Sequence, residues 1–182
     1  MLKLLIFIIL LTFYNPALAT LQKNIVSKME LINNLSFDFI QTAVGKSEKG
    51  SCIIEYPKKI YCEYDNSNKK IIVSNGKSLV IKNKNSGNYY IYPLKQTPLA
   101  LILDKNYLIS KIKNLEPQKI NNRYLNFQIL ENKKYINIFF DKDTFGLTGW
   151  QTRDIYQNLT ETLLSSVKIN QKINDDIFIL PK

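Results

Sequence analysis

The chain has 182 residues, of which 45% are hydrophobic, and a formal net charge of +10 that is carried mainly by scattered lysines. Histidine is absent and only two cysteines are present, which excludes Ser-His-Asp catalysis and a structural zinc site with four Cys or His ligands. The lysines are not clustered with arginine or interleaved with aromatic residues, so nucleic-acid binding is not expected.

The first 19 residues have the pattern of a secretory signal peptide. Lys3 precedes an apolar run from Leu4 to Leu11, and Ala-Leu-Ala at residues 17–19 forms a small-x-small cleavage site. The apolar run is shorter than the roughly 20 residues that span a bilayer. The sequence therefore predicts cleavage after Ala19 and export of residues 20–182 as one domain, without a lipid-bearing cysteine at its start.

Residues 21–34 are predicted to form an amphipathic helix, and a strand follows. The helix has one apolar face at the 3.6-residue period. In the strand, residues 35–42, the period changes to two, with Leu35, Phe37 and Phe39 on one side. The apolar helix face is formed by Leu21, Ile25, Met29 and Ile32.

The segment "GSCIIEYPKKIYCEYD", residues 50–65, predicts a hairpin that turns at Pro57. This turn pairs Ile54 with Ile60 and Cys52 with Cys62, so that both cysteines point to the apolar side. Export to an oxidising compartment favours a cross-strand disulfide. The alternative is a pair of reduced, buried cysteines that act as small apolar side chains.

Residues 71–83 predict a second hairpin, with Asn75 and Gly76 as a two-residue turn of positive φ. A strand at 88–94 precedes a short helix at 97–104, in which Thr97 is the expected N-cap and Pro98 the first helical residue. The helix is apolar on most sides, and it must therefore be covered on most sides. Its main apolar face is formed by Leu99, Ile102 and Leu103.

Further strands are predicted at 119–130, 135–141, 147–156 and 159–170. The fold class is therefore α+β and mainly β: an incomplete, strongly curved antiparallel barrel of about nine to eleven strands, with helices covering the concave side. The acidic pairs Asp141/Asp143 and Asp175/Asp176 fall in predicted turns, where Asp is common. With no nucleophile motif, P-loop or dinucleotide fingerprint, neither enzyme activity nor a cofactor or metal is expected.

The inward strand faces are rich in large apolar side chains, and two interpretations remain open from the pattern. A filled core beneath the helices is favoured by the close packing of protein interiors. The other interpretation is a lined cavity with the 97–104 helix as its lid. The inward residues are Phe37, Phe39, Ile54, Tyr56, Ile60 and Tyr64.

From about residue 21 to its end, the chain resembles the LolA family of outer-membrane lipoprotein carriers. "LSFDFIQT" is similar to the family's early strand with its Phe-x-Gln, and the Cys52–Cys62 segment to its strand, proline turn and aromatic return strand. "IIVSNGKSLVIKN" resembles the family's second hairpin, and "TPLALIL" its Thr-Pro helix. "LTGWQTRDIYQNLTETLLSSVKIN" and "IFILP" resemble the C-terminal strands of alphaproteobacterial members.

The resemblance implies a periplasmic, monomeric carrier that shields the acyl chains of triacylated lipoproteins and has no enzymatic activity. Its partners would be an ATP-driven inner-membrane release complex of the ABC type and an outer-membrane acceptor. Tyr56 takes the place of a family arginine that holds the lid shut, and its hydroxyl could hydrogen-bond to the lid backbone. The implied cavity residues are Phe37, Phe39, Ile54, Tyr56, Ile60, Tyr64, Leu99, Ile102 and Leu103.

Alternative functions also fit this fold. One is the acceptor role of the related LolB family, although its members are lipoproteins and no cysteine follows the predicted cleavage site here. Another is a periplasmic sensor of mislocalised lipid or protein, which would be expected to have a second domain. A third is a binding module for some other apolar ligand.

Overall fold

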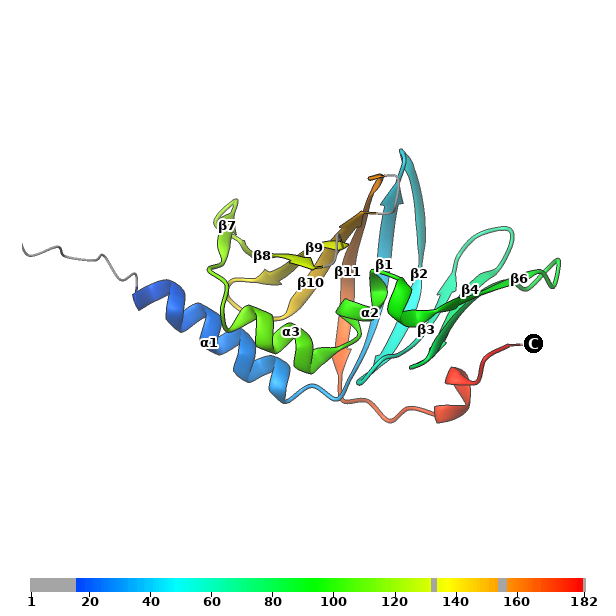
Figure 1. Cartoon of the computed structure of the whole chain (residues 1–182), viewed down its shortest axis with the longest axis horizontal. Helices are drawn as coiled ribbons and strands as arrows, with labels where there is room; N and C mark the ends of the chain where they lie inside the picture. The colour runs from blue at the N-terminus through cyan, green and yellow to red at the C-terminus, as the bar shows by residue number, and fades with distance from the viewer. Residues whose placement is uncertain (1–15, 132–133, 154–156, 182) are drawn as a thin grey trace, which may run out of the picture.

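The computed structural model describes residues 16–131, 134–153 and 157–181. In these ranges the chain forms one antiparallel sheet of 11 strands and three α-helices (Figure 1). The helices are α1 (Pro16–Glu30), α2 (Leu99–Ile102) and α3 (Lys105–Ile112), with short 3-10 helices η1 (Leu94–Gln96) and η2 (Asp175–Phe178). The strands are β1 (Asn34–Ala43), β2 (Lys46–Glu55), β3 (Lys59–Tyr64), β4 (Lys70–Asn75), β5 (Ser78–Asn83), β6 (Tyr89–Pro93), β7 (Gln118–Ile120), β8 (Tyr124–Glu131), β9 (Lys134–Asp141), β10 (Leu147–Arg153) and β11 (Leu159–Ile169).

The strand order is β6-β5-β4-β3-β2-β1-β11-β10-β9-β8-β7. Hairpins connect neighbours on each side, and the first strand pairs with the last in the middle of the sheet. The sheet is therefore open, with β6 and β7 as its two edges. The predicted mainly β fold of about nine to eleven antiparallel strands is confirmed, and the open sheet is consistent with a curved, incomplete barrel.

The first helix begins and ends earlier than predicted. It runs from Pro16 to Glu30 rather than over 21–34, and Asn34 already belongs to β1. Leu31 and Ile32 follow it in a turn, with N–H···O bonds of 3.2 and 3.1 Å to the carbonyls three residues before. Such tighter bonds are common where a helix ends. The expected cleavage after Ala19 lies inside α1, and residues 1–15 of the expected signal peptide lie outside the described residues.

The β4–β5 turn is one residue later than predicted. Gly76 and Lys77 connect the strands, and of the expected pair only Gly76 has a positive φ, of 94°. Asn75 stays in β4, where its side-chain oxygen accepts hydrogen bonds from the N–H groups of Lys77 and Ser78, each at 3.0 Å. The side chain of Asn75 therefore stabilises the turn from the preceding position.

The segment around the predicted 97–104 helix also differs from the prediction. Thr97 is not an N-cap, because its hydroxyl donates backwards to the carbonyl of Leu94 at 2.8 Å. Pro98 is the N-cap of α2, which begins at Leu99. The sequence did not predict α3, although Asp104 is a good N-cap and accepts a hydrogen bond from the Tyr107 N–H at 3.1 Å.

The strands of the second half differ from prediction mainly at their ends. The single strand expected over 119–130 is two strands, β7 and β8, joined by a turn at Asn121 and Asn122, which have φ of 48° and 52°. Asparagine tolerates this left-handed conformation better than most residues. The strand expected over 147–156 is β10, described to Arg153, and residues 154–156 lie outside the described ranges.

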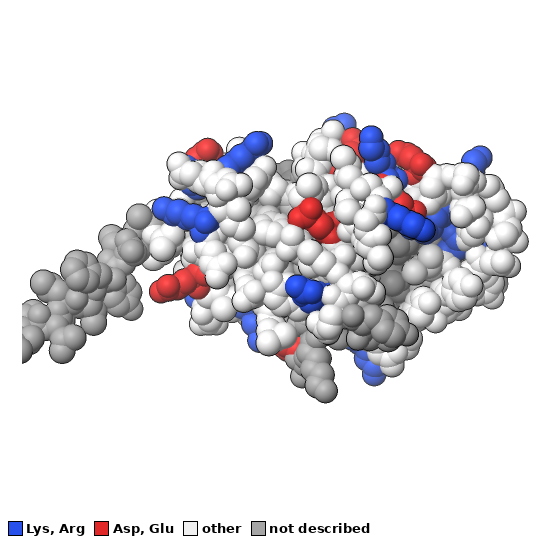
Figure 2. Space-filling model, turned by 90° about the horizontal axis from the view of Figure 1, so that it is seen from above, with Lys and Arg blue, Asp and Glu red and all other residues white. Residues whose placement is uncertain are grey.

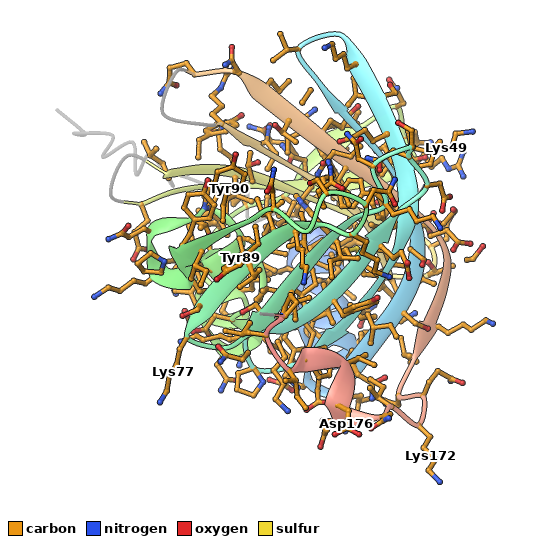
Figure 3. All side chains as sticks on the ribbon, turned by 90° about the vertical axis from the view of Figure 1, so that its right-hand side faces the viewer. Lys49, Lys77, Tyr89, Tyr90, Lys172 and Asp176 are labelled. Carbon is orange, nitrogen blue, oxygen red and sulfur yellow. A yellow bond between two sulfur atoms is a disulfide. The ribbon has the colours of Figure 1, made fainter. Side chains whose placement is uncertain are left out.

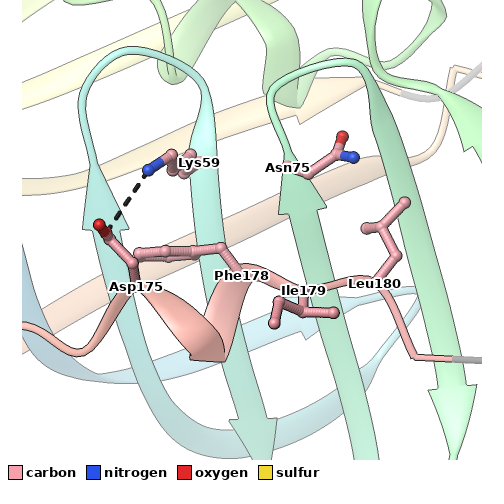
Figure 4. Close-up of a pocket in the computed structure, with 6 residues that line it drawn as sticks. All are labelled: Lys59, Asn75, Asp175, Phe178, Ile179 and Leu180. Carbon is pink, nitrogen blue, oxygen red and sulfur yellow. Dashed lines mark ion pairs between the residues drawn. The ribbon is translucent and has the colours of Figure 1, made fainter.

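The C-terminal segment packs across the outside of the first half of the sheet. Here η2 contacts β3 and β4, and Phe178 is only 3% exposed (Figure 4). The Lys59 ammonium lies 3.5 Å from the Asp175 carboxylate and 5.3 Å from the centre of the Phe178 ring. Ile71, Val73 and Val80 are buried on this same side of the sheet.

Cys52 and Cys62 lie directly opposite each other on β2 and β3, and their sulfur atoms form a disulfide. Both side chains are buried among apolar neighbours. The predicted pairing of Ile54 with Ile60 is also observed. The disulfide therefore joins the neighbouring strands β2 and β3 on the apolar side of the sheet.

Removing this disulfide is expected to lower the free energy of unfolding by roughly 2.5 to 3 kcal/mol, the value for so short a loop in the chain-entropy model. Urea unfolding of the wild type with and without reductant measures the loss, and a Cys52→Ala, Cys62→Ala chain shows whether reductant has other effects. Two free thiols in the unreduced, denatured wild type would contradict the pairing.

Candidate functional site

One face of the sheet carries two apolar rows of side chains that cross strands β1 to β6. We call the face that carries Phe37 and Phe39 the inner face. The strand register places one row of side chains across six neighbouring strands of this face. The row consists of Phe37, Cys52, Cys62, Ile72, Ile81 and Tyr90.

A second row runs beside the first and contains one polar residue, Ser74. The Ser74 hydroxyl is buried and makes two hydrogen bonds. It donates to the carbonyl of Lys58 at 3.0 Å and accepts from the N–H of Gly76 at 3.1 Å. The row therefore presents no unsatisfied polar group to the interior. Its members are Leu35, Ile54, Ile60, Ser74, Leu79 and Tyr92.

The inner face becomes polar beyond Phe39 and Tyr64, whose rings pack edge to face with centroids 4.9 Å apart. The Tyr64 hydroxyl donates to Gln41 at 3.0 Å, and Gln41 donates to Thr162 at 3.1 Å. Burial raises the pKa of the Tyr64 hydroxyl above its ordinary value, so it stays a neutral donor. This hydrogen-bonded row marks one end of the apolar surface.

Gly50 is required at this end because Phe39 and the neighbouring strand leave no room for a side chain. A Cβ atom there would lie 2.1 Å from the carbonyl oxygen of Glu63 and 3.0 Å from a Phe39 ring carbon. We expect Gly50→Ala to displace β3 and lower the free energy of unfolding, by about 1 to 3 kcal/mol as overpacking typically does. Urea unfolding measures the loss.

The side chains of the inner face are buried to different degrees across the sheet. Side chains of the β8–β10 half are buried together with those of α1 and α3 in one hydrophobic cluster (Figure 1). Exposure of the inner-face side chains increases towards β6. Ile72 and Ile81 are partly exposed, and Tyr90 and Tyr92 are 64% and 43% exposed. The apolar face is thus continuous from a buried part to an exposed part.

Little free space is found where the buried part of the inner face meets α1 and α3. A cavity of about 20 Å³ lies between Met29 of α1, Leu108 of α3 and Phe140 of β9. That space suits about one water molecule, whereas pockets for drug-sized ligands measure about 300 to 1,000 Å³. A ligand of that size could enter the buried part only if side chains or a helix moved.

Polar contacts fix the corner between α2 and α3. The N–H of Lys58 donates to the Leu103 carbonyl at 2.9 Å, and the Lys58 ammonium lies 3.1 Å from the Asp104 carboxylate. Lys105 donates from its ammonium to the Ile32 carbonyl at 2.7 Å. The corner is therefore tied both to the turn after Pro57 and to the residues that follow α1. Sequence reasoning missed these residues, although Asp104 as an N-cap was a usable signal.

Tyr56 does not form the bond to the lid that the sequence suggested. Among the described residues its hydroxyl has no hydrogen bond to α2, and its ring lies 5.9 Å from the Lys105 ammonium. Burial raises the pKa of this hydroxyl, which is therefore neutral at ordinary pH. A hydrogen bond to Leu103, the C-cap of α2, comes instead from the N–H of Lys58, two residues further along the chain.

The structure gathers the expected site residues in one cluster. Seven of them are buried there, and Tyr56 and Leu99 are partly buried against them. Nothing in the cluster resembles a catalytic or metal centre: the described residues contain no group of three or more His, Cys, Asp or Glu that could hold a metal ion. The buried seven are Phe37, Phe39, Ile54, Ile60, Tyr64, Ile102 and Leu103.

Residues 30–180 match the model of the family described as outer membrane lipoprotein carrier protein LolA. The chain belongs to the LolA family. The family is named for carrying lipoproteins. No curated protein sequence gives a significant match. Among the described helices of this LolA-family chain, none is long and apolar enough to cross a membrane.

Solved structures share the fold of this LolA-family chain. An uncharacterized conserved protein from Thermus thermophilus superposes with a TM-score of 0.53 at 8% identity, covering 90% of this chain and 94% of that one. A putative outer membrane lipoprotein-sorting protein domain from Vibrio parahaemolyticus gives 0.51 at 7% identity, covering 88% and 95%. At these identities the likeness shows the fold alone.

Proposed function

We propose that this chain is a periplasmic carrier that binds the acyl chains of lipoproteins and moves them from the inner to the outer membrane. The observation that carries the proposal is the inner face, which continues without a polar break from the buried cluster to the partly exposed Ile81 of β5 and the exposed Tyr90 and Tyr92 of β6. Membership of the LolA family and the signal-like residues 1–19 support the same interpretation.

An apolar binding face is what this cargo requires. Each CH₂ group of an acyl chain costs about 0.8 kcal/mol when it is exposed to water, so a triacylated protein cannot cross an aqueous compartment unshielded. Shielding needs no covalent chemistry, and the site offers none. The acyl chains would contact Phe37, Ile54 and Ile60 once the site opens.

Loading requires an opening step, because the buried part of the inner face has little free space. In the proposal α2 is the cover over the concave side of the sheet, and the Lys58–Asp104 corner is its latch. In α2 and its C-cap, Ile102 and Leu103 are fully buried and Leu99 is partly buried. Displacing α2 would expose these side chains, and an acyl chain would replace their contacts with the strands.

The proposed partners follow from the family. An inner-membrane ABC-type complex would supply the lipoprotein and the energy for its release, and an outer-membrane acceptor would receive it. The carrier itself would act as a monomer with one acyl site.

Two measurements test the carrier proposal. The purified exported chain should bind a fluorescent apolar probe at one saturable site, and it should release a lipoprotein into solution from inner-membrane vesicles that contain the release complex. Saturable probe binding without release would leave an apolar-ligand-binding module, and the absence of both would overturn the proposal.

Asp104→Asn tests the latch. Asparagine keeps the N-cap of α3 but removes the charge that pairs with Lys58. Because this pair is partly exposed, the free energy of unfolding should fall by less than about 1 kcal/mol, while the probe should associate faster. Stopped-flow fluorescence measures the rate. Glu30→Gln is the matched control: it breaks the Lys113–Glu30 pair, 3.3 Å long, which joins α3 to α1. Equal association rates in both variants would contradict the latch.

A further inference from the structure

The β4–β6 end of the molecule has an unbalanced charge. Residues 66–103 contain six lysines and no aspartate or glutamate, although the whole chain has 15 acidic residues. Lys70 pairs with Glu48 of β2, and Lys84 pairs with Glu63 of β3. The lysines are Lys69, Lys70, Lys77, Lys82, Lys84 and Lys95. In Figure 2 the right-hand end, which these strands form, shows lysines and uncharged surface.

The edge of this end is an exposed aromatic strand. In β6, Tyr90 and Tyr92 lie on the inner face, whereas Tyr89 and Ile91 lie on the opposite face. Tyr89 is 47% exposed and Ile91 is 57% exposed. Proteins usually protect an edge strand with charge, proline or a covering segment, yet all five residues of β6 are exposed and only the last is proline. The inner pair belongs to the face proposed to bind acyl chains, whereas the outer pair has no role in that proposal.

Tyrosine beside lysine is the composition of a surface that meets lipid headgroups. Tyrosine places its ring at the boundary between hydrocarbon and water, and lysine attracts anionic lipid. On its outer side β6 pairs with no other strand among the described residues. Backbone groups left open there could not enter hydrocarbon, but at headgroup depth water and phosphate oxygens can pair with them. Contact with a membrane at headgroup depth is therefore compatible with all three features: the exposed tyrosine rings, the positive charge of the lysines and the edge position of β6.

We propose that β6 and its flanking lysines form a docking surface for an anionic phospholipid bilayer. Tyr89 and Ile91 would enter the headgroup region, while Lys77, in the turn beside the end of β6, would contact anionic headgroups. Figure 3 looks onto this end and shows Tyr89 and Tyr90 on the near strand, with Lys49 on the opposite side of the view. The surface does not depend on the carrier function, but docking here would bring the open end of the inner face against the bilayer.

Vesicle sedimentation tests the proposal with the purified exported chain. The chain should bind vesicles of phosphatidylcholine mixed with phosphatidylglycerol, bind pure phosphatidylcholine much more weakly, and lose affinity as salt rises. Lys77→Gln should weaken binding roughly fivefold. Tyr89→Thr with Ile91→Thr should weaken it roughly tenfold or more, because apolar contact with the interface is lost.

Matched controls separate this surface from general charge and hydrophobicity. Lys49→Gln removes an exposed lysine elsewhere, and Ile40→Thr with Leu130→Thr removes two exposed apolar side chains of other strands. These variants should bind vesicles like the wild type. Probe binding at the inner face should survive Tyr89→Thr with Ile91→Thr, so failure of docking and failure of the carrier function can be told apart.

Three results would overturn the docking surface. The first is no preference for phosphatidylglycerol, and the second is an equal loss of binding in the control variants. The third is that the chain forms a dimer which Tyr89→Thr with Ile91→Thr dissociates, while vesicle binding stays unchanged. That result would assign the β6 edge to a contact between two copies of the chain.

Discussion

Ile102→Glu is expected to abolish most apolar-probe binding and to destabilise the fold by about 4 kcal/mol. Ile102 is fully buried in α2, within the same cluster as the inner-face strands. The substitution removes the packing of the isoleucine and puts a carboxyl group among buried apolar side chains. It would also place a charge on the surface proposed to meet the acyl chain. Fluorescence titration measures the affinity and urea unfolding measures the stability.

The effect should depend on pH in a defined direction. Burial would raise the pKa of the new carboxyl above its unfolded value of about 4.3, so the native state would bind more protons than the unfolded state. The destabilisation should then be smallest near about pH 4 and grow as the pH rises towards neutrality. The wild type provides the baseline at each pH.

Gln96→Glu is the matched control, because Gln96 is exposed in η1 and receives the same charge near the same helix. It should leave affinity and stability nearly unchanged. If Ile102→Glu does not fold, Ile102→Ala gives a smaller, measurable loss of affinity. Wild-type affinity in a folded Ile102 variant would show that α2 does not cover the binding face.

Phe178→Ala is expected to lower the free energy of unfolding by about 3 kcal/mol. Phe178 is buried where the C-terminal segment packs on β3 and β4. Its ring also forms a cation–π contact with the Lys59 ammonium. Truncation removes a large buried aromatic side chain and uncovers the apolar outer side of these strands, including Val73. Urea unfolding should show the loss, and limited proteolysis should cut the released segment.

Ile179→Ala provides the comparison for Phe178, since the neighbouring Ile179 is 68% exposed. It should change the free energy of unfolding by less than about 0.5 kcal/mol, as surface substitutions generally do. Similar losses in the two variants would mean that the segment is not anchored by Phe178.

Local periodicity made much of this fold predictable. The change from a 3.6-residue to a two-residue period separated α1 from β1, and alternation around Pro57 predicted the β2–β3 register. That register alone places Cys52 opposite Cys62, because a hairpin turn fixes which residues face each other. Turn residues predicted the exact position of the β4–β5 turn less well. Asn75 was expected inside this turn, but it lies in β4 and its side chain stabilises the turn from there.

The sequence by itself determined which strand faces are apolar, because alternation is a property of neighbouring residues. Tertiary structure decided what covers each face. Val73 and Val80 lie on the outer side and would be predicted to be exposed, yet the C-terminal segment, distant in sequence, packs over that side. Only the folded chain brings Lys58 to Asp104 and leaves β6 as a bare edge, since these depend on strand order across the whole sheet.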